Sequence, residues 1–309
     1  MAFLLFLKKK IIKTTTCLIP GRDRRRLMRK RLEYRWGCLQ TAAYDIYFDS
    51  VWHKHAGLLE NADKIDTLIL GDSHAQFGVV PFLMGPGAYN YAFNANSLYE
   101  TFESLKFAAG HCKNLKTVIL MCSFYNGGYS LIRGSEAWHC RILAKKFAMN
   151  YDFSLNPGYD FDFYDKIIEK LSPDPDKVCC QGYDFVGQRI NRSTKKTRER
   201  ALHHYKIYQK YDNQWPLLEE ICQFCVSAGI RPVIVDSPAR SDYTAVLDEA
   251  EKGADLSAGL KQIAKRLGVL FVEMSGGFDD EDFADADHLN FNGAVKLTRR
   301  LMDSVDIKQ

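Results

Sequence analysis

The sequence predicts an α/β protein built around a five-stranded parallel sheet with helices on both faces. Five short apolar runs, bounded by Gly, Asp, Ser or Asn, have the composition of buried strands: residues 67–70, 88–92, 117–121, 232–235 and 269–272. Helical patterns of about ten to fifteen residues lie between most of them, as is typical of a parallel sheet. With 309 residues, 46% of them hydrophobic, the chain can bury a sizeable core.

The first 40 residues are expected to form a basic amphipathic segment ahead of an α/β domain at 41–309. Residues 1–36 hold twelve Lys and Arg against two acidic residues, about +10, so the remainder carries about −6 of the formal net charge of +4. Apolar residues beside clustered cations are typical of a helix on an anionic membrane surface, and a solvated tail is the open alternative. Nucleic acid is not expected as a partner, because the segment has few aromatic residues and no recognisable reading module.

Targeting signals and cysteines indicate the compartment. The apolar run at 3–7 precedes its Lys cluster, the reverse of a signal peptide, and no run of apolar residues is long enough to span a bilayer. The nine cysteines show no disulfide framework. We therefore expect a cytoplasmic protein with reduced thiols, peripheral to the membrane if the basic segment docks there.

The first predicted strand ends in Gly71-Asp72-Ser73-His74. A Ser directly after a buried strand projects its hydroxyl at the carboxyl edge of the sheet, where open α/β sheets bind ligands. Gly-Asp-Ser also forms ordinary turns and helix caps, so the motif needs a partner to indicate catalysis. Asp72 fits a turn-stabilising carboxylate, and His74 fits either a pocket wall or a cap.

The middle of the chain departs from the strand–helix rhythm. A helix is predicted at 97–109, but no clear strand occurs from about 127 to 215. A structureless loop of this length is uncommon, so we expect a large, mostly helical insertion at the upper edge of the sheet. Within it, the basic run at 189–200 is expected to be a solvated loop and helix start, with binding of an anionic substrate as the alternative.

Near the other end, Asp285-Ala286-Asp287-His288 precedes the last predicted helix. A Ser nucleophile needs a base, and His is suited to that role near neutral pH. The His in turn needs an acid that fixes its tautomer. Asp285, three residues earlier in the turn, can supply it. Asp287 competes for this role, but adjacent side chains seldom orient each other.

In these two motifs the sequence resembles the SGNH/GDSL superfamily of esterases and acyltransferases. The family's Gly-Asp-Ser block follows the first strand, and its Asp-x-x-His block precedes the last helix; the resemblance covers roughly residues 65–126 and 230–305. It implies a three-layer flavodoxin-like fold and a triad of Ser73 as nucleophile, His288 as general base and Asp285 as orienting acid. Gly-Asp-Ser-His with His-Leu-Asn is similar to a branch found among bacterial surface-polysaccharide and lipopolysaccharide modification proteins.

Two other motifs of the family are altered in this chain. Ala95 stands where the family has a Gly whose backbone N–H helps to bind the oxyanion. Asn126 is the expected side-chain donor, although the usual Gly-x-Asn-Asp is absent, and Asn94 or Ser123 could serve instead. Arg240, which follows the fourth predicted strand, is placed to reach an anionic substrate.

The resemblance implies a serine hydrolase, an esterase or an O-acyltransferase, that acts on an acylated small molecule or carbohydrate in polysaccharide biosynthesis, without cofactor or metal. An alternative of another class is a non-catalytic binding or scaffold protein of the same fold at the cytoplasmic membrane face, docked through residues 1–36. The two interpretations differ in geometry. Only the enzyme requires the side chains of Ser73 and His288 to lie within hydrogen-bond reach.

Overall fold

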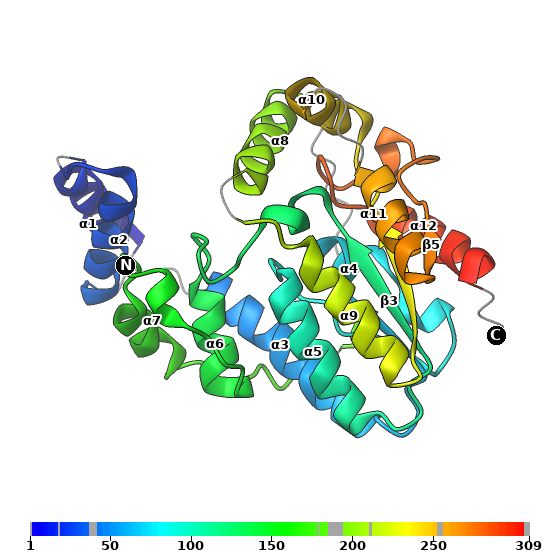
Figure 1. Ribbon diagram of the computed structural model, residues 1–309. Helices are drawn as coiled ribbons and strands as arrows, with labels where there is room; N and C mark the ends of the chain where they lie inside the picture. Colours follow the sequence, from blue (N-terminus) through cyan, green and yellow to red (C-terminus); the bar gives the residue numbers. More distant parts are fainter. Residues whose placement is uncertain are drawn as a thin grey trace. The chain divides into compact units, whose positions relative to one another are not determined.

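The structure, a computed structural model, describes residues 2–17, 19–36, 42–177, 179–184, 194–209, 212–251 and 256–305 of the chain. They divide into two compact units (Figure 1). We call Met1–Asp49 with Ala137–Pro173 the helical unit, and Ser50–Glu136 with Asp174–Gln309 the sheet unit. The domain boundary at residue 40 and the insertion limits near 127 and 215 stay predictions.

The sheet unit contains five parallel strands in the order β2-β1-β3-β4-β5. They are β1 (Thr67–Leu70), β2 (Ala88–Asn90), β3 (Thr117–Cys122), β4 (Arg231–Asp236) and β5 (Leu270–Val272). This is the strand order of flavodoxin-like sheets. The predicted α/β class and the five-stranded parallel sheet are therefore confirmed, and each strand lies within two residues of its predicted limits.

Alternate residues of the strands pack against different helices, which gives three layers. Ile69, Ile119 and Val233 belong to one core cluster with residues of α4 (Ser73–Gly78) and α12 (Phe291–Val305). Their neighbours in sequence point to the other face because side chains alternate along a strand. That face is covered by helices that contact β1 and β4, namely α5 (Leu98–His111), α9 (Trp215–Ser227) and α11 (Leu256–Leu267) (Figure 1).

The long connection from β3 to β4 consists of helices and loops where the structure describes it. Between residues 127 and 215 the described segments contain helices and no named strand, as expected for this region. Besides α9 and α11, the helices of this connection and of the next one are η2 (Phe124–Gly128), α6 (Trp138–Phe147), η3 (Phe153–Leu155), α7 (Phe161–Ile168), α8 (Thr194–Tyr208) and α10 (Ser241–Glu251). The short helices η1 (Pro81–Leu83) and η4 (Asp280–Asp282) lie elsewhere in the sheet unit.

The helical unit combines the N-terminal helices with α6 and α7. Its other helices are α1 (Ala2–Thr16), α2 (Arg22–Arg35) and the first residues of α3 (Ala42–Glu60). Lys30 links α2 to α3 and to α7, because its Nζ donates to the Tyr44 hydroxyl of α3 at 3.0 Å and to the Tyr164 hydroxyl of α7 at 3.2 Å. Arg141 and Asp165 form a bidentate pair at 2.8 Å that ties α6 to α7.

Membrane-spanning helices and the state of the cysteines bear on the compartment of the protein. In the part of the chain that the structure describes, no helix combines the length and the apolar character needed to cross a bilayer. The cysteines in that part are free thiols, and most of them are buried. The cytoplasmic location stays a prediction.

Candidate active site

Ser73 lies at the first position of α4, directly after β1, at the carboxyl edge of the sheet. Asp72 caps this helix, because its Oδ1 accepts a hydrogen bond from the His74 N–H at 2.8 Å. β1 has β2 on one side and β3 on the other, so Ser73 stands where the strand order reverses. Such a point is where open α/β sheets form their ligand crevice.

Gly71 allows the sharp turn from β1 into Ser73. Its φ is +143°, and a Cβ at this position would lie 2.6 Å from the Met121 carbonyl oxygen. We expect Gly71→Ala to lower the free energy of unfolding by at least about 2 kcal/mol, measured by chemical denaturation. Gly110→Ala is the matched control on α5, because a Cβ there meets open space. Equal effects of the two substitutions would contradict the steric explanation.

The loop ahead of α12 is fixed by its own hydrogen bonds. Asp285 Oδ1 accepts from the N–H groups of Asp287 at 3.1 Å and His288 at 2.9 Å. Asn290 Oδ1 accepts from the Gly293 N–H at 3.0 Å and so caps the start of α12. Asp285 and His288 are therefore held relative to each other by the backbone of one short loop.

Ser73, His288 and Asp285 are connected in series. His288 Nε2 lies 2.8 Å from Ser73 Oγ, and His288 Nδ1 lies 3.0 Å from Asp285 Oδ2. Asp287 Oδ1 is farther away, 3.9 Å from Nδ1, so Asp285 is the better placed of the two candidate acids. An ionised carboxylate only accepts, so Nδ1 carries the proton and Nε2 is left to accept from the Ser73 hydroxyl. Burial raises the pKa of Asp285, but its hydrogen bond with His288 and nearby charge lower that pKa below its usual value.

Beside Ser73, His288 and Asp285, the side chain of His74 lies between two buried carboxylates. Its Nδ1 lies 2.9 Å from Asp72 Oδ1, and its Nε2 lies 3.3 Å from Asp287 Oδ2. The His74 ring stacks on the ring of His288, with centroids 4.9 Å apart. We call Asp72, His74 and Asp287 the His74 bridge. It joins the turn that carries Ser73 to the loop that carries His288.

The opposite charges of its members stabilise the His74 bridge in a buried environment. Burial lowers the pKa of His74, but the charge of Asp72 and the proximity of Asp287 outweigh burial and raise this pKa to about 10. Burial raises the pKa of Asp72, but the charge and hydrogen bonds of His74 lower it to about 2. Near neutral pH the bridge therefore consists of an imidazolium between two carboxylates.

Two residues of α8 at this site were missed by the sequence analysis, which treated the basic run up to Arg200 as a solvated loop and helix start. Arg200 Nε lies 2.5 Å from Asp287 Oδ1, and Nη1 lies 3.7 Å from Asp285 Oδ2. His204 Nδ1 lies 3.6 Å from Asp287 Oδ2, and burial lowers the pKa of His204 to about 3, so it is neutral. No sequence spacing relates α8 to the loop at 285–288; the basic composition of the run was the one available signal.

Ala95 and Asn94 follow β2 at the same edge of the sheet. Ala95 is buried and has a φ of +62°, the left-handed conformation that Gly adopts most readily. The side chain of Asn94 is exposed. Their roles toward an oxyanion stay predictions.

Asn126 and Arg240 are both engaged by neighbouring side chains. Asn126 Nδ2 donates to Asp72 Oδ2 at 3.1 Å, and its Oδ1 accepts from the Ser123 N–H at 2.6 Å. Arg240 donates to both oxygens of Asp242 at 2.7 Å and is 3% exposed. Asn126 therefore supports the turn that carries Ser73 through its hydrogen bond with Asp72. Binding of an oxyanion by Asn126 and of an anionic substrate by Arg240 stay predictions.

Three side chains in the described part of the chain are close enough to be considered as metal ligands. The ligand atoms of His74, Asp287 and His288 lie within 4.8 Å of one another. A protonated His74 has no lone pair to offer a cation, and both nitrogens of His288 are engaged by Ser73 and Asp285. The arrangement fits proton transfer better than metal binding. The expected absence of a metal stays a prediction.

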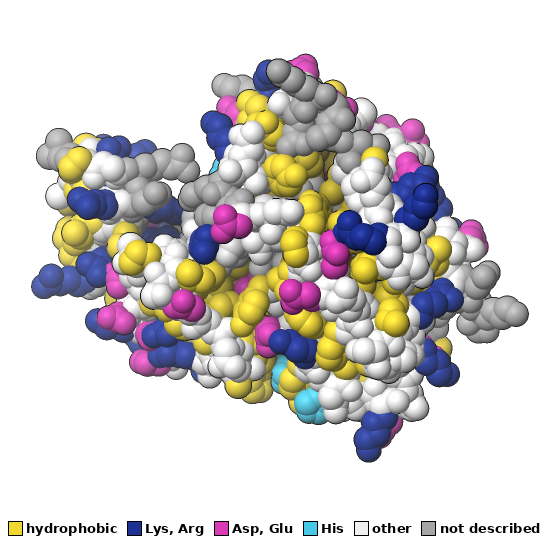
Figure 2. Space-filling model, viewed as in Figure 1, with side chains coloured by type: hydrophobic (Ala, Val, Ile, Leu, Met, Phe, Trp, Pro, Cys, Tyr) yellow, Lys and Arg dark blue, Asp and Glu magenta, His cyan; other side chains and the backbone are white. Residues whose placement is uncertain are grey.

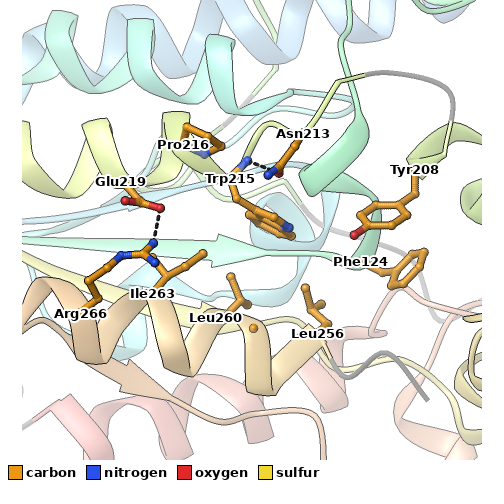
Figure 3. A pocket seen from close by; sticks show the side chains of 11 residues that line it. Phe124, Tyr208, Asn213, Trp215, Pro216, Glu219, Leu256, Leu260, Ile263 and Arg266 are labelled. Atoms are coloured by element: carbon orange, nitrogen blue, oxygen red, sulfur yellow. Dashed lines mark hydrogen bonds and ion pairs between the residues drawn. The ribbon is translucent and has the colours of Figure 1, made fainter. Parts of the chain in front are cut away.

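A separate pocket of about 340 Å³ lies between α9 and α11 in the sheet unit (Figure 3). The rings of Phe124, Tyr208 and Trp215 face the aliphatic side chains of α11 across it, and the Arg266–Glu219 ion pair closes one end. This pocket is not lined by Ser73, His288 or Asp285. It is therefore distinct from the site at Ser73.

Comparison with known proteins yields similarity in structure alone. No family model matches the sequence, and no curated protein matches it. A structure described as a "putative acylhydrolase" from Bacteroides fragilis NCTC 9343 is 11% identical, with 84% of this chain and 98% of that chain covered and a TM-score of 0.43. A structure described as a "putative platelet activating factor" from Streptococcus pneumonia is 12% identical. The match covers 85% of this chain and 96% of that chain, with a TM-score of 0.42. Likeness at these levels says nothing about activity.

Proposed function

We propose that the chain is a serine esterase or O-acyltransferase of the SGNH type that acts on an acylated carbohydrate. The observation that carries this proposal is the series of contacts from Ser73 Oγ through His288 to Asp285, at 2.8 and 3.0 Å. These distances meet the requirement for a nucleophile, its base and the acid that orients the base. The carbohydrate as acyl carrier comes from the sequence resemblance.

The first half of the reaction transfers the acyl group to Ser73. His288 Nε2 takes the hydroxyl proton while Ser73 Oγ attacks the acyl carbonyl carbon. The bond from this carbon to the alcohol oxygen then breaks, and His288 returns the proton to the leaving alkoxide. Water or a sugar hydroxyl repeats these steps on the acyl-Ser73, which yields hydrolysis or transfer.

Backbone donors at the sheet edge supply the support for the oxyanion in this proposal. The N–H of Ser73 belongs to the first turn of α4, where backbone N–H groups lack an intrahelical acceptor. The N–H of Ala95 makes no hydrogen bond to the described residues. Two N–H groups of this kind are a usual arrangement for stabilising a tetrahedral intermediate.

Fixed charges surround His288. The carboxylates of Asp72, Asp285 and Asp287 face two cations, His74 and Arg200, which leaves one net negative charge. The proton that His288 receives from Ser73 balances this charge. Groups held in place beforehand stabilise such a transition state without reorganising.

The alternative of a non-catalytic scaffold is less well supported. A scaffold of this fold does not require Ser73 to meet a base, whereas His288 Nε2 lies at hydrogen-bond distance from its hydroxyl. The loop of His288 is also built to hold the Asp285–His288 pair. Both features favour the enzyme.

Labelling with a fluorophosphonate probe tests whether Ser73 is activated, and it requires no knowledge of the substrate. We expect wild-type protein to be labelled, Ser73→Ala to remain unlabelled, and His288→Ala to be labelled at least about 100-fold more slowly. Ser227→Ala, an exposed serine at the end of α9, is the matched control and should label as wild type does. Equal labelling of wild type and Ser73→Ala would refute the proposed nucleophile.

A further inference from the structure

Helix α1 packs against α2 along one side. Lys8 Nζ donates to the Trp36 carbonyl at 3.0 Å, and Arg29 Nε of α2 donates to Thr16 Oγ1 at 3.5 Å. Ile12, on the same side of α1 between them, is 1% exposed. Residues four apart share one side of a helix, so Lys8, Ile12 and Thr16 define the side that faces α2.

Three large apolar side chains of α1 are exposed to solvent. Phe6 is 62% exposed, Leu7 41% and Ile11 45%, and at 100° per residue these side chains point away from the side that faces α2. Surface helices normally bury their apolar side. We call Phe6, Leu7, Lys10 and Ile11 the outer face of α1.

Cations accompany the outer face on α1 and on its neighbour α2. Lys9 and Lys13 lie beside it on α1, and the sequence of α1 contains no acidic residue. On α2, Arg24, Arg25 and Arg26 add further positive charge. Figure 2 shows Lys and Arg side chains next to apolar ones over the surface of these two helices.

We propose that the outer face of α1 binds an anionic lipid surface. The two kinds of side chain serve different parts of such a membrane: Phe6, Leu7 and Ile11 enter the boundary of the acyl chains, while the lysines meet the lipid phosphates. Nucleic acid would use the cations but would leave the exposed apolar side chains in water. A lipid surface therefore fits both observations.

Vesicle flotation of the full chain tests this proposal. Wild-type protein should float with phosphatidylcholine vesicles that contain about 30 mol% phosphatidylserine, and should stay unbound with phosphatidylcholine alone. The triple variant Phe6→Asp, Leu7→Asp, Ile11→Asp should lose at least about tenfold in bound fraction. The matched control is Leu59→Asp, Phe82→Asp, Val226→Asp, which adds the same three negative charges at apolar residues of the sheet unit that are 43%, 40% and 58% exposed. It should float as wild type does.

A second variant separates loss of contact from loss of the helix itself. This variant carries Lys9→Glu, Lys10→Glu and Lys13→Glu. It keeps the apolar residues, and Glu favours a helix about as well as Lys does. It should also lose binding to anionic vesicles. The proposal is overturned if wild type stays unbound with anionic vesicles, or if either variant floats as well as wild type. Tighter binding to single-stranded RNA than to these vesicles, measured by fluorescence anisotropy, would likewise overturn it.

Discussion

Ser73→Ala and His288→Ala are each expected to lower kcat for p-nitrophenyl acetate hydrolysis by on the order of 10⁴-fold or more. Without Ser73 no acyl-enzyme can form, and without His288 no base removes the proton across the 2.8 Å contact. Because the two residues act as one unit, the double variant should be no slower than the worse single variant. The measurement is the steady-state rate of purified protein at neutral pH.

Ser227→Ala controls for purification and for trace contaminants, because it removes a hydroxyl from the surface of the same unit. It should keep the wild-type rate. If wild type and both active-site variants show the same background rate on this ester and on acylated sugars, the catalytic proposal fails. Failure here would leave the vesicle experiment unaffected, since that experiment concerns α1 alone.

His74→Ala is expected to lower the free energy of unfolding by about 3–5 kcal/mol. It removes the cation of the His74 bridge and leaves the carboxylates of Asp72 and Asp287, each 1% exposed, without their common partner. Uncompensated buried charges are among the costliest defects in a folded protein. Urea denaturation near pH 7 measures the effect. His111→Ala on α5 is the matched control and should cost less than about 1 kcal/mol.

The same bridge predicts how stability changes with pH. The folded pKa of His74 is raised to about 10, so its stabilisation is fully present below its ordinary value of 6.5 and is lost as pH rises through about 10. The folded pKa of Asp72 is lowered to about 2, so its contribution is present above 3.8 and is lost as pH falls through about 2. Wild type should therefore lose stability from pH 6.5 to 10 more steeply than His74→Ala. Parallel curves would show that the bridge is not charged as described.

Much of the scaffold follows from local patterns in the sequence. The runs around Leu68, Ile119 and Ile234 are short, apolar and bounded by turn residues, and these features suffice to locate buried strands. For the candidate site, the sequence motifs left two interpretations open, and only the enzyme required the side chains of Ser73 and His288 to lie within hydrogen-bond reach. The structure brings these two side chains into contact.

The surroundings of the site could not be predicted in the same way. Arg200 reaches Asp287 from α8, and no residue spacing relates these two parts of the chain. His74 as a charged bridge depends on Asp72 in its own turn and on Asp287, which approaches it from a distant segment. The sequence left His74 open between a pocket wall and a cap, because the charge of a histidine is set by neighbours that tertiary structure alone supplies.

The contact between Ser73 and His288 joins residues 215 positions apart in a chain of 309. During synthesis, at about 5–20 residues per second, the segment with Ser73 leaves the ribosome long before His288 is made. The nascent chain therefore carries Ser73 without His288, and His74 without Asp287, until synthesis reaches the last helix. The contact of Ser73 with His288 and the His74 bridge can form only after this point.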